Sequence, residues 1–581
     1  MARSPSVEAF EKDGTLNATS SGESAAGFAG DFDWGPCELE TTVSSIDDLI
    51  AFFAKPTDRN YADWFSASNF LNYSSKLYVV RAIDEDTALN AGVAPAAAPG
   101  IGNPLTEPKG FLVKSANHFE TSKGTNTCLF TAKYPGELGN SIAVHIADNG
   151  TFAKWKYKNL FDSAPDDTPG SAVNVAAAMD EIHVVIIDSL GSFTNVPGSV
   201  LETYSYLAKS RDGRDLTGSN AYYANVINRT SKYVYAVNVL GNAFMKDTAN
   251  LSPWGGKIAD KKPFAQLKVP FEAELGLGTV GTKPTKADYI QGYSIFESIE
   301  DEDMNMIITG NCGGDENHAD VANAVLDMCQ RSMRMVGFVS PKATDVVGGL
   351  KQDIPDKIEK TYEDLTSLHS YGHMSTAYKM QYDKFNDVYR WIPGNADDAG
   401  LYARTHNQVG KFASAAGYNR GKYANIVALA YSPDKTVRDR LYRSGINAVI
   451  QEKGEGIILM GDRTLQLKDS AFRSMGVRFL FIDLRLTISR SAKYHLFEFN
   501  DSHTRAQFRD STEPVLRDIR GKKGIVDYRI VCDETNNTVD VIQRGEFIGD
   551  IYIKPQYSIQ FVILNFNAVD QGVNFEERFG A

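Results

Sequence analysis

The stretch Met304–Ser340, MNMIITGNCGGDENHADVANAVLDMCQRSMRMVGFVS, decides the fold class. Met304–Thr309 is a short run of large apolar residues typical of a buried strand, and Met335–Ser340 repeats that pattern. Between them, Ala319–Met333 places apolar residues on one face of a helix. A strand, a helix and a strand in this order predict a doubly wound α/β domain.

A second α/β segment lies near the N-terminus. Ala25–Phe32 is a small apolar strand, Ser44–Asp48 reads as a helix start with serine caps and early acids, and Leu77–Ala82 is a buried-type strand. We expect residues 23–90 to form the first part of this middle α/β domain and residues 290–432 to form the second, across an insertion.

The insertion begins after a linker rich in Ala, Pro and Gly, Ala91–Pro104. Residues 105–245 are rich in strand and turn patterns and predict an inserted β-rich domain, with one helix expected near Gly198–Lys209. Residues 246–290 are rich in Gly, Pro and Lys and predict a long hairpin or loop.

A compact α+β domain is predicted over residues 433–566. Its long amphipathic helix covers Val477–Tyr494, and a second helix covers Thr504–Arg520, interrupted or started afresh at Pro514. Three strands are expected to follow, at Val526–Cys532, Phe547–Lys554 and Tyr557–Phe566. The predicted fold class is therefore a multidomain combination of α+β and α/β.

Both ends of the chain read as arms. Residues 1–22 are too poor in large apolar side chains to form a core, so we interpret them as an extended arm, with a disordered tail as the alternative. Residues 567–581 are a polar tail with isolated apolar side chains, Val573, Phe575 and Phe579.

The net charge of −13 argues against a general nucleic-acid binder. Charge is uneven, since 435–523 contains 18 Lys/Arg against 11 Asp/Glu. Such a region faces an acidic partner, or it is chance variation on a solvated surface. Five cysteines without a CxxC pair suit a reducing compartment. The absence of an apolar run of 18 residues predicts no membrane insertion.

Several motifs resemble catalytic signatures without their context. Gly276–Gly281 matches GxGxxG, but Pro284 follows where a phosphate-binding helix should begin. Gly417–Tyr423 has a P-loop appearance with the wrong spacing. His369 and His373 lack further ligands nearby, and the adjacent Asp501, Ser502 and His503 do not make a triad by adjacency. We therefore predict no catalytic residue, no cofactor and no metal site.

Short motifs spread over nearly the whole chain carry a family resemblance. They include NYADWF (60–65), YPGELGN (134–140), YRWIPGN (389–395), GDRTL (461–465), LFEFND (496–501), RAQFR (505–509), VCDETNN (531–537) and NFEE (574–577). In these motifs and their order, the chain resembles the contractile tail sheath proteins of T4-like phages.

The resemblance implies a structural protein and no enzyme. Such subunits form a cylinder of stacked hexameric rings around a tail tube, and the cylinder contracts on a baseplate signal to drive the tube through the host envelope for genome ejection. The implied partners are the chain itself, the tail tube, and the baseplate and tail terminator proteins, without nucleic acid. The implied location is the virion tail, assembled in the host cytoplasm.

The resemblance also assigns roles to the domains. Residues 433–566 become the inner sheath domain and residues 105–245 an outer domain, while the two arms add strands to neighbouring subunits. T4's own subunit is longer, so we expect this chain to lack part of the outermost decoration. Two alternatives stay open: the sheath of a phage-derived, tailocin-like injection device, and a cytosolic α/β enzyme.

Two sets of site residues follow. The C-terminal arm is expected to form inter-subunit strands through Val573, Phe575 and Phe579. The basic helix is expected to face the tube through Arg505, Arg509, Arg517, Arg520, Lys522 and Lys523, because one side can bury its apolar residues and leave the arginines outward. Pairing of these arginines with Glu513, Asp510 or neighbouring subunits is the alternative.

Overall fold

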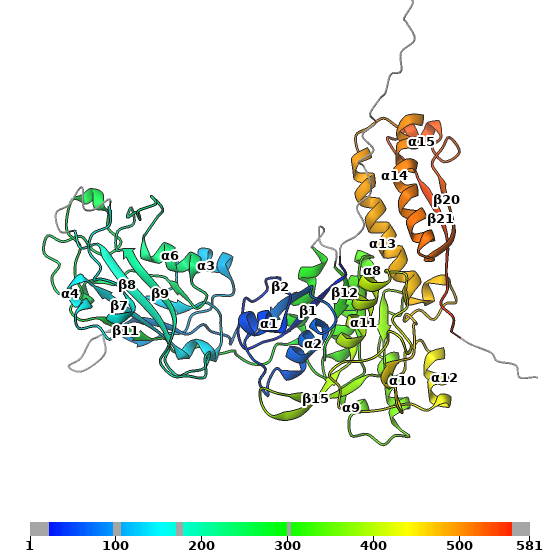
Figure 1. Cartoon of the computed structure of the whole chain (residues 1–581), viewed down its shortest axis with the longest axis horizontal. Helices are drawn as coiled ribbons and strands as arrows, with labels where there is room; N and C mark the ends of the chain where they lie inside the picture. Colours follow the sequence, from blue (N-terminus) through cyan, green and yellow to red (C-terminus); the bar gives the residue numbers. More distant parts are fainter. Residues whose placement is uncertain (1–22, 97–105, 170–177, 299–303, 561–581) are drawn as a thin grey trace, which may run out of the picture. The chain divides into compact units, whose positions relative to one another are not determined.

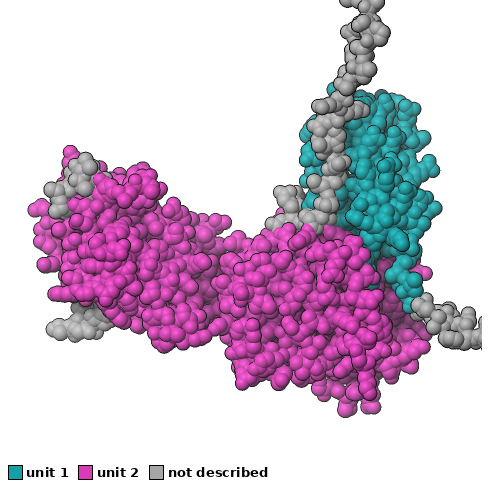
Figure 2. Space-filling model, viewed as in Figure 1, with its two compact units in different colours: residues 1–20, 412–414, 476–581 teal, residues 21–411, 415–475 magenta. Residues whose placement is uncertain are grey.

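The computed structural model describes residues 23–96, 106–169, 178–298 and 304–560. The chain divides into two compact units (Figure 2). The main unit contains the described residues from 23 to 411 and 415–475, and the C-terminal unit contains residues 412–414 and 476–560. Each unit has its own core, and we describe them separately.

A six-stranded sheet in the order β14-β13-β12-β1-β3-β2 organises the middle of the main unit (Figure 1). β1 lies between β12 and β3 and is parallel to both, with Gly27 opposite Ile307 and Tyr78. In this register, the segments before and after the insertion form one sheet. The strands are β1 (Ala25–Asp31), β2 (Thr41–Val43), β3 (Leu77–Ala82), β12 (Met304–Ile308), β13 (Val336–Val339) and β14 (Gly372–Met374).

Helices cover both faces of this sheet. α7 (Lys286–Ser294) packs on β1 and β3 and lies beside α8 (His318–Ser332), while α2 (Tyr61–Leu71) packs on the same two strands and lies beside α11 (Asn395–Gln408). Because both faces are covered, every residue of β1, β3, β12 and β13 is buried. This is the two-sided burial expected of the predicted doubly wound domain.

Smaller elements complete the region. β15 (Tyr378–Asp383) pairs with β16 (Val388–Pro393) and with the short β17 (Ala428–Leu429), and β18 (Val449–Glu452) pairs with β19 (Gly456–Leu459). The remaining helices are α1 (Ile46–Phe53), α9 (Ala343–Val346), α10 (Ile354–Glu363) and α12 (Lys435–Arg443).

The insertion is built from two four-stranded sheets around one apolar core. The first has the order β10-β6-β4-β5 and the second β11-β7-β8-β9. Its strands are β4 (Gly92–Pro95), β5 (Thr106–Pro108), β6 (Phe130–Ala132), β7 (Ile142–Asp148), β8 (Glu181–Asp188), β9 (Ser199–Ala208), β10 (Val234–Ala236) and β11 (Phe271–Glu274). Its helices are α3 (Ala116–Ser122), α4 (Asn149–Phe152) and α6 (Tyr223–Thr230).

Two details of the sequence interpretation are wrong here. The inserted sheets reach beyond 105–245, because β4 precedes these bounds and β11 follows them, within the predicted linker and long loop. The helix expected near Gly198–Lys209 is the ten-residue strand β9. Its Val, Thr and Tyr residues are stiff at χ1 or aromatic, which favours a strand, and pairing along β8 selects that state.

The chain enters and leaves the insertion at adjacent points. Leu89 and Thr279 exchange two backbone hydrogen bonds of 2.9 Å, and Gly92 and Gly276 form a second bridge. Arg81, fully buried at the end of β3, donates to the carbonyls of Gly35 and Pro135 at 3.0 and 2.9 Å. Both ends of the inserted chain are therefore held by hydrogen bonds.

The C-terminal unit is a helical pair packed on a two-stranded sheet. α13 (Met475–Ala492) and α14 (Ser502–Gly521) share an apolar core with β20 (Ile525–Val531) and β21 (Asp550–Pro555), centred on Leu480, Leu484 and Leu516. A short helix, α15 (Val539–Gln543), joins the two strands.

Three expectations for this region need correction. The boundary predicted at residue 433 falls at 475/476, because α12, β18 and β19 belong to the main unit. α14 continues through Pro514 without a break. Residues 557–560 of the third predicted strand are not in a strand, and 561–566 lie outside the described residues.

Candidate functional site

Helix α14 presents one buried and one exposed face. Asp501 caps it by accepting a hydrogen bond of 2.8 Å from the Thr504 amide, so its place before Ser502 and His503 has a structural explanation. The buried face consists of Thr504, Arg505, Phe508, Thr512, Leu516 and Ile519.

Arg505 does not face outward, in contrast to the prediction from the sequence. It is only 7% exposed, because it follows Thr504 on the buried face of α14, and its Nη1 donates to the Asn500 side chain at 3.0 Å. Within one subunit it therefore does not present its charge to a partner.

The other predicted tube-facing residues, Arg509, Arg517, Arg520, Lys522 and Lys523, are exposed. Arg517 pairs with Glu513 at 3.0 Å and Lys522 pairs with Asp518 at 2.7 Å, each one helical turn apart. Arg520 lies over the Tyr528 ring, 5.2 Å from its centroid. The local pairing considered as the alternative is therefore present for Arg517 with Glu513, and Lys522 has a further local pair with Asp518, while the tube contact of these residues stays a prediction.

The basic stretch 435–523 does not form one basic body. Residues 435–475 belong to the main unit, and the hairpin that follows α14 is acidic. The described part of the C-terminal unit contains 13 Lys/Arg and 12 Asp/Glu. The described part of the C-terminal unit therefore carries almost no net charge, and its attraction to an acidic surface would depend on a local patch such as the exposed face of α14.

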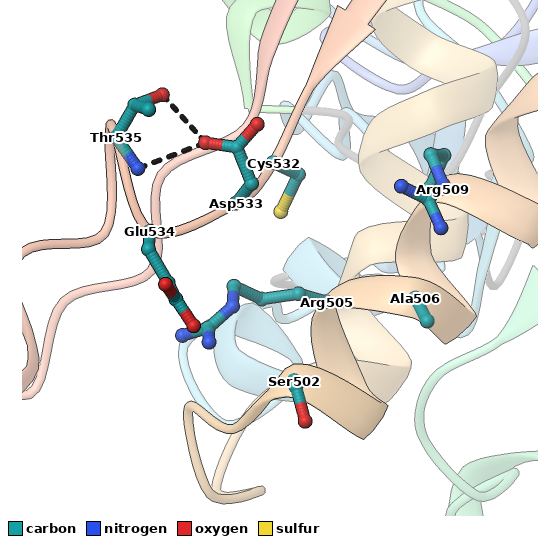
Figure 3. Close-up of a pocket in the computed structure, with 8 residues that line it drawn as sticks. All are labelled: Ser502, Arg505, Ala506, Arg509, Cys532, Asp533, Glu534 and Thr535. Atoms are coloured by element: carbon teal, nitrogen blue, oxygen red, sulfur yellow. Dashed lines mark hydrogen bonds between the residues drawn. The ribbon is translucent and has the colours of Figure 1, made fainter.

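A polar hollow of about 290 Å³ lies beside the start of α14 (Figure 3). Arg505 extends across it toward Glu534, and Arg509 lies further along the helix. Asp533 is held in the facing turn by the amide and hydroxyl of Thr535. Burial raises the pKa of the Cys532 thiol, which the two arginines partly oppose. The hollow therefore combines two guanidinium groups with two carboxylates.

Exposed large apolar side chains are concentrated in the C-terminal unit. Its 88 described residues carry 10 of them, whereas the 428 described residues of the main unit carry 19. The ten are Tyr494, Leu496, Phe497, Phe499, Val526, Val539, Ile542, Tyr552, Tyr557 and Ile559. Such a density on a small unit is typical of a surface that other chains cover.

The small sheet of this unit also has open edges. β20 and β21 pair only with each other among the described residues, from Ile525 opposite Pro555 to Val531 opposite Asp550. Two strands alone are marginally stable, and their outer edges present unpaired backbone groups to an added strand. The predicted strand residues Val573, Phe575 and Phe579 lie outside the described residues.

In the six-stranded sheet of the main unit, the chain runs from β1 toward β3 on one side and from β12 toward β13 on the other. Doubly wound sheets bind ligands at the carboxyl ends of two such neighbouring strands. In this protein, side chains of the chain itself occupy that position. At the ends of these strands, Asp63 accepts from the Asp31 amide at 2.9 Å and from the Tyr289 hydroxyl at 2.7 Å. Asn395 donates to the Gly310 carbonyl at 2.7 Å. Burial raises the pKa of Asp31 to about 7 and that of Asp63 to about 6.

The motifs considered for catalysis occupy structural positions. Gly276–Gly281 lies in the extended segment that pairs with Leu89 and Gly92, before α7 begins at Lys286. Gly417–Tyr423 forms a turn in which the Gly421 amide donates to the Gly417 carbonyl at 2.8 Å. His373 is buried on β14, and burial lowers its pKa to about 3. No cluster of three or more metal-ligating side chains occurs in the part of the chain that the structure describes.

Comparison with known proteins assigns the chain to a family. Residues 282–465 match the family model for the phage tail sheath protein central domain, and residues 468–568 match the phage tail sheath C-terminal domain. The tail sheath protein of Enterobacteria phage T4 is 30% identical, with the alignment covering 99% of each chain. The chain belongs to the phage tail sheath protein family. Its function is therefore structural, as a subunit of a contractile phage tail sheath.

A second relative and a solved structure are also similar to this chain. The tail sheath protein of Salmonella phage ViI is 29% identical over 99% of this chain and 97% of its own length. The crystal structure of the sheath tail protein Lin1278 from Listeria innocua is 11% identical and shares the fold, with a TM-score of 0.52 over 92% of this chain and 95% of that one. Among the described residues, no helix is both long and apolar enough to cross a lipid bilayer.

The alignment with the T4 protein runs over 656 positions, 75 more than this chain has residues. The T4 protein therefore carries segments that this chain lacks.

Proposed function

We propose that this sheath subunit polymerises around a tail tube through its C-terminal unit, in stacked hexameric rings assembled in the host cytoplasm. On a signal from the baseplate, the polymer would contract and drive the tube through the host envelope, releasing the phage genome. The observation that carries the proposal is the C-terminal unit itself, with ten exposed large apolar side chains on 88 described residues and a two-stranded sheet whose outer edges pair with no other described strand.

The open sheet supports a specific mode of assembly. An added strand satisfies backbone groups at an exposed edge, and alternate side chains then pack on the face beneath it. Residues 1–22 and 567–581 are the segments we assign to this role, with Val573, Phe575 and Phe579 as the apolar contacts. Each subunit would thereby complete the sheet of a neighbour.

Truncation tests this mode of assembly. Variants lacking residues 1–20 or 570–581 should remain folded and monomeric, because both units have large apolar cores among the described residues. They should form no tubes in negative-stain micrographs under conditions where the full chain does. Normal tubes from either variant would contradict strand exchange, and failure of the full chain to form tubes would contradict polymerisation itself.

The exposed face of α14 is our proposed contact with the tube. Exposed ion pairs contribute only about 0–1 kcal/mol each, so several together hold register and still release when the sheath contracts. They also weaken with salt. Arg509, Arg517, Arg520, Lys522 and Lys523 remain in this set, and Arg505 leaves it as a buried residue.

Charge reversal tests the tube contact. The double variant Arg509→Glu, Arg517→Glu should polymerise alone but no longer assemble as extended sheath on purified tubes. A matched control is Arg331→Glu, which removes a similarly exposed arginine–glutamate pair, Arg331 with Glu297 at 3.0 Å, from the main unit. Extended sheath on tubes from the double variant would show that these arginines do not hold the tube.

The insertion is proposed to lie on the outside of the polymer and to contribute little to its lattice. Its own two-sheet core and its paired ends support folding as a separate module. Replacing residues 90–278 with a short Gly/Ser linker should leave a subunit that still forms tubes. A folded remainder that forms none would place the insertion in the lattice.

A further inference from the structure

The main unit has a groove with an aromatic base beside β15. Its volume is about 410 Å³, and its lining includes Trp64 and Phe65 of α2, Gln381 and Lys384 of the β15 hairpin, and Val427. The base is firmly packed, because the Trp64 ring lies edge-on to Phe65 and Phe385 with centroid distances of 5.0 and 5.3 Å. Such a concave site with aromatic walls suits a large apolar side chain.

Two polar features of the groove lack a structural explanation within the subunit. β17 pairs with β15 only at Lys379 and Met380, so β15 has no paired strand on that side from Gln381 onward in the described chain. Gln381 is only 8% exposed, and its Oε1 has no hydrogen-bond partner. A buried acceptor without a donor is costly, so a docked partner that supplied an N–H or O–H group to it would be favoured.

The loop before α14 is a projecting apolar knob. Leu496, Phe497 and Phe499 are largely exposed, and Glu498 is exposed between the two phenylalanines. The loop is fixed at both ends, since His495 stacks on Phe547 with a centroid distance of 6.3 Å and Asn500 donates to the Glu546 carbonyl at 2.9 Å. The apolar side chains are therefore held in solvent by a fixed backbone, at a cost that a partner surface would remove.

We propose that residues 494–499 of one subunit dock into the groove beside β15 of another copy of this chain. This inference rests on the proposed polymerisation and specifies residues that would form one of its contacts. Phe497, the most exposed side chain of the loop, would fill the aromatic base, Glu498 would meet the exposed ammonium of Lys384, and a backbone N–H of the loop would donate to Gln381 Oε1.

Two arguments favour a second copy as the occupant. The loop carries an acid between aromatic residues and the groove carries a base beside aromatic residues, so their charges and apolar surfaces are complementary. The knob and the groove are also different surfaces of one chain. A contact between different surfaces is heterologous and continues from copy to copy, as rings or helical filaments require.

Truncation of the knob tests the apolar part. Phe497→Ala should raise the protein concentration needed for tube formation about tenfold or more, because buried aromatic anchors carry much of an interface's energy. The control is Leu216→Ala, which removes another highly exposed apolar side chain, from the insertion, and should change nothing. Equal melting temperatures of the monomers would exclude misfolding, and tube formation by Phe497→Ala at the wild-type concentration would overturn the proposal.

A charge swap tests the pairing. Glu498→Lys and Lys384→Glu should each weaken tube formation, and the double variant should recover most of it because the pair is restored with opposite polarity. Absence of recovery would show that these residues do not meet.

Cross-linking tests the contact directly. A Leu496→Cys subunit, which keeps both phenylalanines of the loop, mixed with a Val427→Cys subunit should give a covalent dimer with a short bis-maleimide, whereas neither variant alone should. The five native cysteines are buried, so their background reaction should be small. If wild-type protein forms tubes but the mixture gives no dimer, this contact fails and polymerisation stands. If wild-type protein forms no tubes, polymerisation itself fails.

Discussion

The sheets of the middle α/β region and of the C-terminal unit differ in how far the rest of the chain covers them. The six-stranded sheet is covered by helices on both faces and its central strands are wholly buried. The two-stranded sheet of the C-terminal unit is covered on one face, its strands are mostly half-exposed, and its edges have no neighbouring strand in the part of the chain that the structure describes. The sheet of the first region is covered within one chain, whereas the described part of the second leaves strand edges and large apolar side chains exposed, which the proposed assembly would cover. On this proposal, the middle region provides the stable core of the subunit and the C-terminal unit provides its assembly surface.

The buried charges of the middle region should give the largest loss of stability. Lys379 and Asp397 form a fully buried ion pair of 2.9 Å, which the Tyr73 hydroxyl completes by donating to Asp397 at 2.9 Å. Asp397→Ala leaves the ammonium group uncompensated and should lower the free energy of unfolding by about 3–5 kcal/mol.

Chemical denaturation of the purified monomer measures this loss. The matched control is Glu455→Ala, which breaks the half-exposed pair of Lys422 and Glu455 and should cost no more than about 1 kcal/mol. Equal losses for the two variants would contradict the contrast between a buried and an exposed pair.

A substitution in the core of the C-terminal unit should give the second largest loss of stability. Leu516→Ala removes a fully buried side chain from a small core and should cost about 2–5 kcal/mol. Because the unit has its own core, hydrogen exchange followed by mass spectrometry should accelerate in α13, α14 and β20. Exchange in β1 and β12 should stay unchanged, and equal acceleration there would show that the two units unfold together.

The middle region should also carry a pH signature. Burial raises the pKa of Asp398 to about 7, and His373, 3.9 Å away, stays neutral because burial lowers its pKa to about 3. A carboxyl group with a raised folded-state pKa binds more protons folded than unfolded between pH 4 and 7. Its contribution is therefore fully present below pH 4 and is lost as pH rises through 7.

The variant Asp398→Asn should flatten this part of the stability curve. Asp31 and Asp63, whose pKa values burial also raises, would retain their own shares of the slope. The measurement is the free energy of unfolding at several pH values from 4 to 8. An unchanged slope would assign the titration to the other carboxyl groups.

The surface of α14 should give the smallest effect. Glu513→Ala breaks the exposed pair with Arg517 and should change the stability of the monomer by about 0.3–0.5 kcal/mol. If Arg517 faces a tube, the freed guanidinium should instead strengthen the binding of extended sheath to tubes at low salt. Unchanged tube binding would leave the local pair as the only role of Arg517.

The sequence predicts the middle region better than the other parts. The α/β pattern of 304–340 identifies β12, α8 and β13 within one or two residues, because a strand buried on both faces must be a continuous apolar run. The sequence did not predict the strand β9, because its ten residues mix apolar and polar side chains without a strict period. Pairing with β8 decides that these residues form a strand.

The candidate site was predictable only in part. The helix α14 and its exposed basic residues follow from periodicity, but the burial of Arg505 depends on Asn500 and on how the loop folds back. The sequence does not indicate that the exposed knob at Phe497 is a site. Large apolar residues directly before a capped helix are also typical of a segment buried in a core, so this pattern does not distinguish an exposed loop from a buried one.

The paired ends of the insertion make that domain an exchangeable cassette. Leu89 and Thr279 are joined by two hydrogen bonds, so whatever lies between them starts and finishes at one point of the subunit. A different domain whose termini lie a few ångströms apart could replace it without moving β1 or β3. With the insertion on the outside of the sheath, as proposed, its exchange would change the outer surface without changing the α/β region, and the same joint would offer a place to graft a foreign domain onto every subunit of a tail.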